Sequence, residues 1–501
     1  MKKIIIIGGG IAGLSAGIYG LQNGYEVALY EKNATPGGEC TGWNRQGYHI
    51  DNCIHWLTGC IPTNDLYPIW KNIGALKDDT TLYREPYFYC LHKDGKALHF
   101  WSDLEKARAE FLETAPEDSL EINKLFDHIR LSESVRVPCE KSLADMNMID
   151  YLKFGLTMAD MGKVIKEYGN DTIADLAARF QNPFVREMLT QYLHTSYKAI
   201  TLLSSIGFYT GGSAAIPMGG SVGMIKRITD RFLSLGGKLY TNMPATGIQI
   251  DSRQAKSVSF ADGSTADCDF VICTADPAVT FDKLLPAKCM DKKLKNMYET
   301  GEGYHVSSAF HISFGIPGTE GYGLPCGSSV YPCEPYRVGT RDFDHIGIRL
   351  YDYDESLFPA DKRVLQCNIP QEKEDYEYWK ALHADRSRYL AEKEKIAESV
   401  RLRICDLFPV LENKLIVLDT YSPYTFTKWC GAYKGAYMSF FEQKGYKSLT
   451  AKNSIRGLKN VFLASQWLST NGGLPMAAVS GRFAVMNLMK KDGRISKSSR
   501  A

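Results

Sequence analysis

The stretch IIIIGGGIAGLSAGIYGLQNGYEVALYEK, residues Ile4 to Lys32, decides the fold of this chain. Its first residues are β-branched and apolar, which predicts a parallel strand over residues 2–7 that is buried on both faces. Three glycines follow, then a helix of small residues, then a second apolar run over residues 25–30 that ends at Glu31. This order predicts the opening of a Rossmann-like α/β domain that binds a dinucleotide.

The glycines have the spacing G-x-G-x-x-G, at Gly8, Gly10 and Gly13. Gly8 permits a sharp turn after the strand, Gly10 lets a diphosphate approach the backbone, and Gly13 lets the helix pack closely on the sheet. The first helical turn, at Ile11 and Ala12, would direct its N–H groups toward the diphosphate. Because the strand before and the helix after both fit, we prefer this interpretation to a glycine turn in an unrelated α/β fold.

The residues after the second strand indicate which dinucleotide is bound. Glu31 lies 18 residues beyond Gly13, where a carboxylate can accept both hydroxyls of an unphosphorylated ribose, as in NAD or FAD. The next segment, Lys32 to Glu39, is a second glycine-rich loop with no sign of a crossover helix. The apolar and aromatic stretch GYHIDNCIHWLTG, residues 47–59, follows and suits the wall around a ring system. These features favour FAD over NAD.

With its acid, short loop and Gly-Gly pair, the chain resembles the superfamily of FAD-dependent amine oxidases and phytoene desaturases. The resemblance implies that Lys32, Gly37, Gly38 and Glu39 lie against the flavin dinucleotide. The superfamily usually has an arginine after the pair, where this chain has Glu39. Arg45 is close enough in the sequence to supply the missing positive charge.

Residues 216–277 resemble a block of the phytoene desaturases and carotenoid isomerases in order and spacing. Apolar spacing predicts a helix over residues 224–235, and strands are predicted at 238 and over 270–273. The turn at Asp262-Gly263 predicts a hairpin. The resemblance implies that Ala245 passes the adenine and that Thr274 and Ala275 lie close to the dinucleotide.

Residues 460–490 resemble the C-terminal flavin motif of the same superfamily. We expect a strand over residues 461–464, a tight loop over 471–475 and a helix over 477–489. The resemblance implies that Gly473, Leu474 and Pro475 present the helix N-terminus to the flavin pyrimidine edge. The acidic residue that the superfamily has near Ser465 and Gln466 is absent from this chain, and we expect Gln466 to hydrogen-bond the ribityl chain in its place.

The three segments together predict an FAD-binding α/β domain of the amine oxidase type, built from residues 1–75, 215–285 and 455–501. Residues 76–214 and 286–454 are predicted to form an inserted α+β substrate domain. Helical periodicity is present over 103–131 and 149–180, and residues 305–316 alternate like a strand. Residues 47–59 and 421–437 resemble retinol saturase and the phytoene desaturases.

The candidate catalytic residues are His55 and Tyr437, because both fall in the aromatic stretches around the predicted cavity. A histidine packed near the flavin, and an aromatic ring in the core, are the competing interpretations. Tyr433 has the same two interpretations. Asp51 is better explained as an acceptor in a backbone turn. Cys40 and Cys53 are interpreted as inert apolar side chains.

Composition excludes several classes of protein. The net charge of 59 − 57 = +2 gives no reason to expect a nucleic-acid partner. The 13 cysteines are single, with no metal-binding spacing, which predicts reduced thiols in the cytoplasm and no metal. The sequence predicts neither a signal peptide nor an apolar run of about 20 residues that could span a membrane. The methionine-rich stretch over residues 145–166 fits a core helix, or else a peripheral contact with the inner face of the membrane.

Three functions fit these features. The first is an enzyme with non-covalent FAD that desaturates, saturates or isomerises an apolar polyene or isoprenoid. The second is a flavin amine oxidase, which shares the fold and the Gly-Gly loop. The third is a prenyl-lipid escort protein that has lost its flavin, which the complete glycine motif and Glu31 argue against. Because no segment resembles an NAD(P)H module, the electron acceptor stays unassigned.

Overall fold

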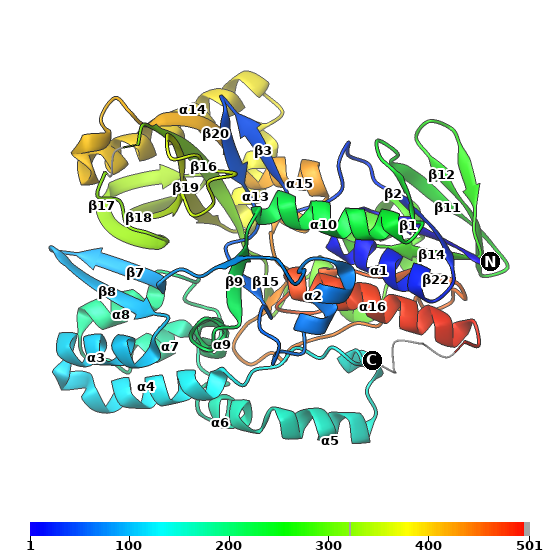
Figure 1. Ribbon diagram of the computed structural model, residues 1–501, viewed down its shortest axis with the longest axis horizontal. Helices are drawn as coiled ribbons and strands as arrows, with labels where there is room; N and C mark the ends of the chain where they lie inside the picture. The colour runs from blue at the N-terminus through cyan, green and yellow to red at the C-terminus, as the bar shows by residue number, and fades with distance from the viewer. Residues whose placement is uncertain (320–321, 495–501) are drawn as a thin grey trace.

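The computed structural model describes residues 1–319 and 322–494 of the chain. Figure 1 shows a parallel sheet in its right half, a larger antiparallel sheet at upper left and a layer of helices at lower left. The last residues of the predicted FAD-binding segment, 495–501, lie outside the described residues. No helix in the described part of the chain is long and apolar enough to cross a membrane.

The parallel sheet has five strands in the order β10-β2-β1-β14-β22. Their bounds are β1 Lys3–Ile7, β2 Glu26–Tyr30, β10 Lys238–Tyr240, β14 Phe270–Cys273 and β22 Val461–Leu463. The central strand β1 pairs in parallel on both sides, with Ile6 opposite Leu29 and Ile272. Its isoleucines are buried, as the apolar run predicts for a strand covered on both faces.

Three helices cover one face of this sheet: α1 Ile11–Gln22, α10 Gly220–Ser234 and α16 Leu474–Lys491. Small residues let these helices approach closely, since a Cβ at Gly17 would meet the Phe232 ring at 2.6 Å. A Cβ at Gly481 would meet the carbonyl oxygen of Ala12 at 2.5 Å. The helix α16 starts three residues earlier than its sequence predicts, because Pro475 fits the first helical turn, where no N–H partner is needed.

A three-stranded meander packs beside the parallel sheet, with β11 Ala245–Asp251, β12 Gln254–Phe260 and β13 Thr265–Asp267. Its last turn contains Gly263 with a positive φ of 86°. Short pairs and bridges connect the domain to the rest of the chain. These are β3 Gly42–Arg45 with β4 Tyr48–Asp51, β5 Leu57–Thr58 and β6 Leu82–Tyr83 with β9 Ala214–Pro217, and β15 Tyr304–His305 with β21 Phe441–Glu442.

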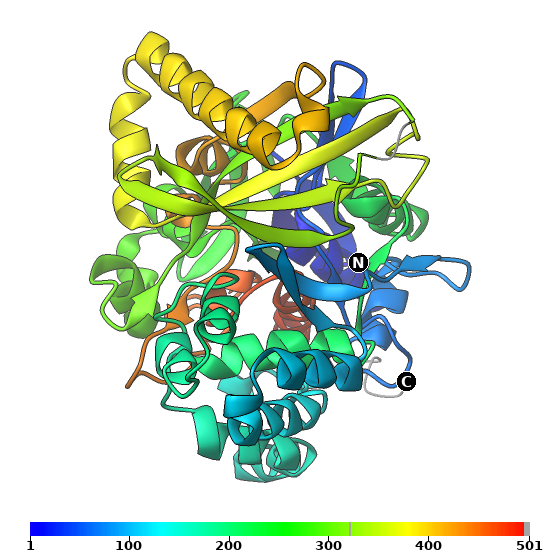
Figure 2. The ribbon, with the colours of Figure 1, turned by 90° about the vertical axis from the view of Figure 1, so that its left-hand side faces the viewer.

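The second sheet has seven strands in the order β20-β16-β19-β18-β17-β7-β8. The strands are β7 Tyr87–Lys93, β8 Lys96–Trp101, β16 Ser308–Pro317, β17 Ser328–Val338, β18 Arg341–Tyr351, β19 Lys362–Gln371 and β20 Ile416–Tyr421. Only β7 and β17 pair in parallel among these neighbours, with Cys90 opposite Ser329. This pair joins a hairpin from early in the chain to strands from much later. Helices α13 Lys373–Leu382 and α14 Arg386–Leu407 cover the outer face, which Figure 2 shows from the side.

The helical layer lies on the other side of the cavity from the second sheet. Its members are α3 Leu104–Thr114, α4 Ser119–Ser132, α5 Met148–Thr157, α6 Ala159–Tyr168, α7 Ile173–Ala177, α8 Pro183–Thr190 and α9 Ala199–Thr210. The two predicted helical stretches are therefore divided into two and three helices. The remaining helices are α2 Tyr67–Ile73, α11 Pro277–Val279, α12 Lys292–Glu299 and α15 Pro423–Cys430.

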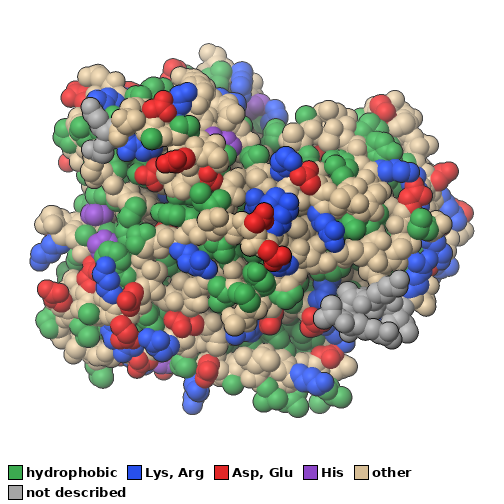
Figure 3. Space-filling model, in the orientation of Figure 1, with side chains coloured by type: hydrophobic (Ala, Val, Ile, Leu, Met, Phe, Trp, Pro, Cys, Tyr) green, Lys and Arg blue, Asp and Glu red, His purple; other side chains and the backbone are tan. Residues whose placement is uncertain are grey.

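The methionine-rich stretch corrects one prediction. The core interpretation holds for α6, where Met161, Val164 and Tyr168 are buried. It is wrong for α5, which has no buried residue. Met148 is 88% exposed and Leu156 is 69% exposed. Green side chains gather along the lower edge of the molecule in Figure 3, where α5 lies in Figure 1.

Candidate functional site

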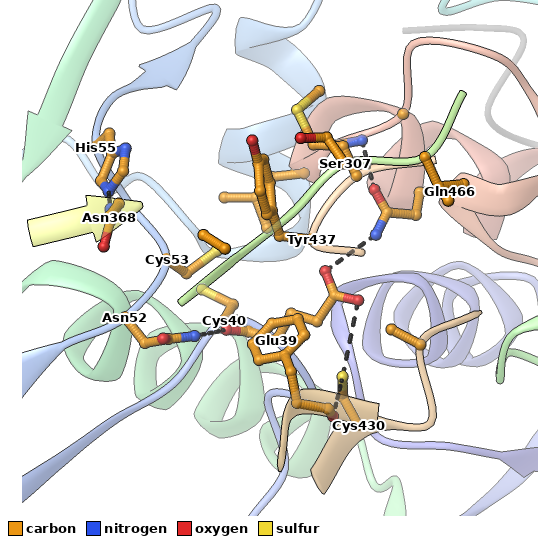
Figure 4. A pocket seen from close by; sticks show the side chains of 18 of the residues that line it. Glu39, Cys40, Asn52, Cys53, His55, Ser307, Asn368, Cys430, Tyr437 and Gln466 are labelled. Carbon is orange, nitrogen blue, oxygen red and sulfur yellow. Dashed lines mark hydrogen bonds between the residues drawn. The ribbon is translucent and has the colours of Figure 1, made fainter. Parts of the chain in front are cut away.

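One cavity of about 1610 Å³ runs from the glycine turn between β1 and α1 to a chamber between the second sheet and α9. The predicted cofactor and catalytic residues line this cavity, with the single exception of Gly13. Figure 4 shows part of it, with Tyr437 between the Glu39–Gln466 pair and the His55–Asn368 pair in that view. Residues that are far apart in the sequence therefore line one cavity.

Side chains at Gly8 and Gly13 would collide with neighbouring protein atoms. Gly8 has a φ of 109°, and a Cβ there would meet Thr274 Oγ1 at 2.5 Å. Thr274 donates a hydrogen bond to the Gly8 carbonyl oxygen at 2.9 Å and thereby fastens the turn to β14. A Cβ at Gly13 would lie 2.0 Å from the same oxygen. Gly13 thus sets how closely α1 packs, although it does not face the cavity.

The geometry around Gly10 fits a dinucleotide diphosphate. A Cβ on Gly10 would have no atom nearer than the Gly37 carbonyl oxygen at 3.9 Å, so the space above it belongs to the cavity. The Gly37 N–H donates to the Gly9 carbonyl at 2.9 Å, which holds the second glycine loop against the first. Helix α1 begins at Ile11, and its first-turn N–H groups have no acceptors within the helix. An anion in this space would meet backbone donors of the glycine turn and of the first turn of α1.

Glu31 lies at the end of β2 and is 5% exposed. Its two carboxylate oxygens accept hydrogen bonds from the Gly9 N–H at 2.7 Å and the Asn33 N–H at 2.8 Å. Each carboxylate oxygen can accept a second hydrogen bond. The arrangement therefore leaves acceptor capacity toward the cavity, which Lys32, Ala245 and Ala275 also line.

At the opposite wall, the N-terminus of α16 faces the cavity through Gly473, Leu474 and Pro475. The side-chain oxygen of Gln466 accepts a hydrogen bond from the Gly473 N–H at 2.6 Å. Its amide nitrogen donates to Glu39 Oε2 at 3.0 Å. Gln466 therefore connects the second glycine loop to the helix N-terminus, a role that the sequence did not predict.

Glu39 is an acid inside the dinucleotide end of the cavity. Besides Gln466, its carboxyl group has Cys430 Sγ at 3.9 Å from Oε1. Burial raises the pKa of Glu39 to about 8, and the nearby Asp276 adds to this increase. Arg45 does not supply a compensating charge, because it pairs with Asp419 at 3.0 Å on a half-exposed surface and does not line the cavity. The prediction for Arg45 is therefore wrong.

The chamber beyond Tyr437 has mainly apolar and aromatic walls. The lining side chains of this kind include Trp56, Tyr192, Ile200, Phe208, Val330 and Ile348. Some polar lining residues are paired with one another: Glu372 contacts His194 at 2.7 Å and Arg341 at 3.2 Å. Tyr437 is 39% exposed and lines the cavity, as does Ser307.

His55 lies at the boundary between the two ends of the cavity. Its Nε2 accepts a hydrogen bond from the Asn368 amide at 3.3 Å, and its carbonyl oxygen accepts one from Arg349 at 2.7 Å. Burial lowers the pKa of His55 to about 3, and the positive charge of Arg349 acts in the same direction. The imidazole is therefore neutral at physiological pH and serves as an acceptor from Asn368.

Other candidates have structural roles. Asp51 is buried and accepts hydrogen bonds from the Ser221 N–H at 2.6 Å and the Cys53 N–H at 3.3 Å, in agreement with the turn interpretation. Tyr433 does not line the cavity and packs against Tyr298 in an aromatic cluster. Cys40 and Cys53 are free thiols on the cavity wall. Within residues 1–319 and 322–494, no group of three or more His, Cys, Asp or Glu side chains is placed to hold a metal ion.

The sequence analysis did not predict the buried ion pair between Arg349 and Glu85. Its Nη2 and Oε1 atoms are 2.8 Å apart. These residues are 264 positions apart, and only the pairing of β7 with the later strands of the sheet brings them together. Asn368 and Ser307 were missed for the same reason. Each belongs to a strand or loop whose local sequence contains no motif.

The chain is similar to known flavoproteins and carotenoid enzymes. The family model for flavin-containing amine oxidoreductases matches residues 11–489. A 4,4'-diaponeurosporene oxygenase from Staphylococcus haemolyticus is 22% identical over 530 aligned residues, which cover 100% of this chain and 99% of that protein. A 4,4'-diapophytoene desaturase (4,4'-diapolycopene-forming) from Methylomonas is 23% identical, covering 98% of this chain and 96% of that protein.

Two solved structures show the same fold. An oxidoreductase from Methanosarcina mazei has a TM-score of 0.59 at 18% identity, covering 97% of this chain and 100% of that chain. A putrescine oxidase bound to putrescine also has a TM-score of 0.59, at 14% identity, covering 98% of this chain and 99% of that chain.

Proposed function

Because this chain belongs to the family of flavin-containing amine oxidoreductases, we propose that it binds FAD non-covalently and acts on carbon–carbon bonds of an apolar polyene or isoprenoid. The observation that supports this most is the single cavity that joins the glycine turn to an aromatic chamber. Its relatives named as a desaturase and an oxygenase of carotenoids point to the same class of substrate.

The residues that would hold FAD follow the wall of the cavity. Gly8, Gly10 and the start of α1 would take the diphosphate, and Glu31 the ribose of the adenosine half. The N-terminus of α16 at Gly473 would face the flavin ring and favour negative charge on it. Thr274, Ala275 and Ala245 would cover the adenosine half.

Bound FAD supplies hydride transfer at its ring, so the protein has to hold a carbon chain against it and exclude water. The chamber suits this need, because most of its wall is apolar and the charged Glu372 is paired with His194 and Arg341. His55 is neutral and oriented by Asn368, so we assign it to the wall of the site. Tyr437 remains the candidate for proton transfer, since its hydroxyl reaches the cavity.

The first experiment tests the cofactor. Apoprotein incubated with FAD should retain flavin absorbance after gel filtration, and denaturation should release all of that flavin into solution. Protein that stays colourless would favour the escort interpretation. Flavin that stays attached to the denatured chain would contradict non-covalent binding.

The second experiment tests the substrate. Under anaerobic conditions, an acyclic C30 or C40 polyene in detergent should bleach the oxidised flavin, or a conjugated polyene should restore the colour of the reduced flavin. Ser204→Trp, which fills the chamber wall on α9, should abolish this response and keep the FAD. Leu120→Trp, at a surface position that is 80% exposed, is the matched control. Bleaching by putrescine and not by polyenes would instead identify an amine oxidase.

For the peripheral membrane contact we propose α5, because it presents a continuous apolar surface with no partner in the described structure. Ile149, Tyr151 and Leu152 are all more than half exposed. Lys153 lies on this helix, while Lys163 on the next helix is paired with Asp160, so the proposed contact rests on the apolar side chains of α5.

Flotation with anionic phospholipid vesicles tests the contact. The double variant Leu152→Ser/Leu156→Ser should lose vesicle binding. The matched double variant Leu390→Ser/Leu402→Ser, on the exposed side of α14, should keep it. Equal binding by both variants would remove α5 from the proposal.

A further inference from the structure

The position of Glu39 creates an electrostatic problem for the proposed cofactor. The Gly37-Gly38 loop lies against Gly10, where the diphosphate would bind, and Gln466 links Glu39 to the N-terminus of α16. A dinucleotide that extends from Gly10 to Gly473 must therefore pass the Glu39 carboxyl group. A diphosphate and a carboxylate that lie close together in one cavity repel each other unless a cation lies between them.

No such cation is present in the part of the chain that the structure describes. Neither lysine nor arginine forms an ion pair with Glu39 there. The groups that face its carboxyl are the Gln466 amide, the Cys430 thiol from α15 and the Asp276 carboxyl from the loop after β14. Cys53 is the further titratable group that interacts with it. Lys32 also lines the cavity, and it interacts with Glu31 and Cys430.

We propose that Glu39 is a neutral carboxylic acid in the loaded protein, and that FAD binding therefore requires a protonated Glu39 and takes up a proton where Glu39 is ionised in the apoprotein. In this form Glu39 accepts the hydrogen bond from Gln466 through Oε2 and has an O–H to donate to the dinucleotide. Glu39 thus acts as a positioning residue for the dinucleotide, and its protonation couples FAD binding to proton uptake. This inference rests on the proposed binding of FAD.

The ionisable groups around Glu39 have pKa values different from that of Glu39. Burial raises the pKa of Glu39 to about 8 and that of Asp276 to about 6, so Asp276 is already ionised where Glu39 titrates. Burial raises the pKa of the Cys430 thiol well above its usual range, so it stays protonated there. Burial lowers the pKa of Lys32, which also loses charge as pH rises. A variant that alters Glu39 alone is therefore required.

The test measures the Kd of FAD by fluorescence titration from pH 6.5 to 9.5, for the wild type, Glu39→Gln and Glu39→Ala. Any contribution from Lys32 is common to all three proteins. The ratio of the wild-type Kd to the Glu39→Gln Kd should be constant below pH 7 and rise about tenfold per pH unit above pH 8. At pH 9.5 the ratio should be about thirtyfold larger than at pH 6.5.

Calorimetry gives an independent readout. At pH 8, FAD titrations in two buffers of different ionisation enthalpy should show an uptake of about half a proton by the wild type beyond that of Glu39→Gln. Glu39→Ala serves in both measurements if Glu39→Gln does not fold. A ratio of Kd values that is independent of pH, or equal proton uptake by wild type and variants, would overturn the inference. Absence of FAD binding at every pH would instead overturn the proposed function.

Discussion

The two ends of the cavity are built from different parts of the chain. At the dinucleotide end, backbone packs on backbone: a Cβ at Gly13 would meet the Gly8 carbonyl oxygen, and one at Gly37 would meet the Cys40 carbonyl oxygen at 2.5 Å. At the chamber end, rings and aliphatic side chains form the wall, and a buried ion pair supports it. The comparison teaches that the cofactor end tolerates almost no substitution. Substitutions in the chamber wall, in contrast, change side chains that are remote from the glycine turn.

The largest expected effect compares two glycines three residues apart. Gly13→Val should prevent folding or cost about 3 kcal/mol or more, because its side chain would collide with backbone. Gly10→Val should cost less than about 1 kcal/mol, because Gly10 has an ordinary φ of −71° and faces open space. It should nevertheless abolish FAD retention. Thermal unfolding by circular dichroism and gel filtration with FAD measure the two effects, and equal destabilisation would contradict the comparison.

The next largest expected effect on stability concerns the buried Arg349–Glu85 ion pair beside the chamber. Arg349→Met should cost about 3–5 kcal/mol of unfolding free energy, because it leaves the Glu85 carboxylate buried without its partner. The double variant Arg349→Met/Glu85→Gln should recover much of this loss. Folded protein from either variant should bind FAD like the wild type. Loss of FAD affinity in the folded double variant would show that the two ends are coupled.

A smaller effect depends on pH. His55 has a pKa of about 3 in the folded protein and a usual value of about 6.5 when unfolded. Protonation therefore favours the unfolded state as pH falls below about 6.5, and this group should cost up to about 2 kcal/mol at pH 5. Urea unfolding at pH 7.5 and pH 5 should show a shallower pH dependence for His55→Asn than for the wild type. Burial also lowers the pKa of His311, to about 4, so the double variant His55→Asn/His311→Asn separates the two histidines.

The smallest effect on stability compares two tyrosines. Tyr437→Phe should change unfolding free energy by less than about 0.5 kcal/mol, since its hydroxyl faces the cavity. It should slow flavin reduction by the substrate about tenfold or more if Tyr437 transfers a proton. Tyr433→Phe should cost about 1 kcal/mol, because its hydroxyl donates to the Tyr298 carbonyl at 2.9 Å, and leave the rate unchanged. Similar rates for all three proteins would restrict Tyr437 to the cavity wall.

Local sequence was enough to identify the segments that build the dinucleotide end. Gly8, Gly10, Gly13 and Glu31 have a fixed spacing because one strand, one turn and one helix connect them, so their geometry follows from local backbone rules. The buried strands at residues 3–7 and 270–273 were predictable for the same reason, since both are short apolar runs. The exact start of α16 was not, because Pro475 suits both a loop and a first helical turn.

Only the tertiary structure decided the electrostatics and the chamber. The Glu39–Gln466 contact, the Arg349–Glu85 pair and the His55–Asn368 contact join residues separated by more than 260 positions. No local pattern specifies such partners, because each depends on how distant segments of the chain pack together. The exposed face of α5 was hidden for a related reason: apolar periodicity shows that a helix has an apolar side, and only packing shows whether anything covers it.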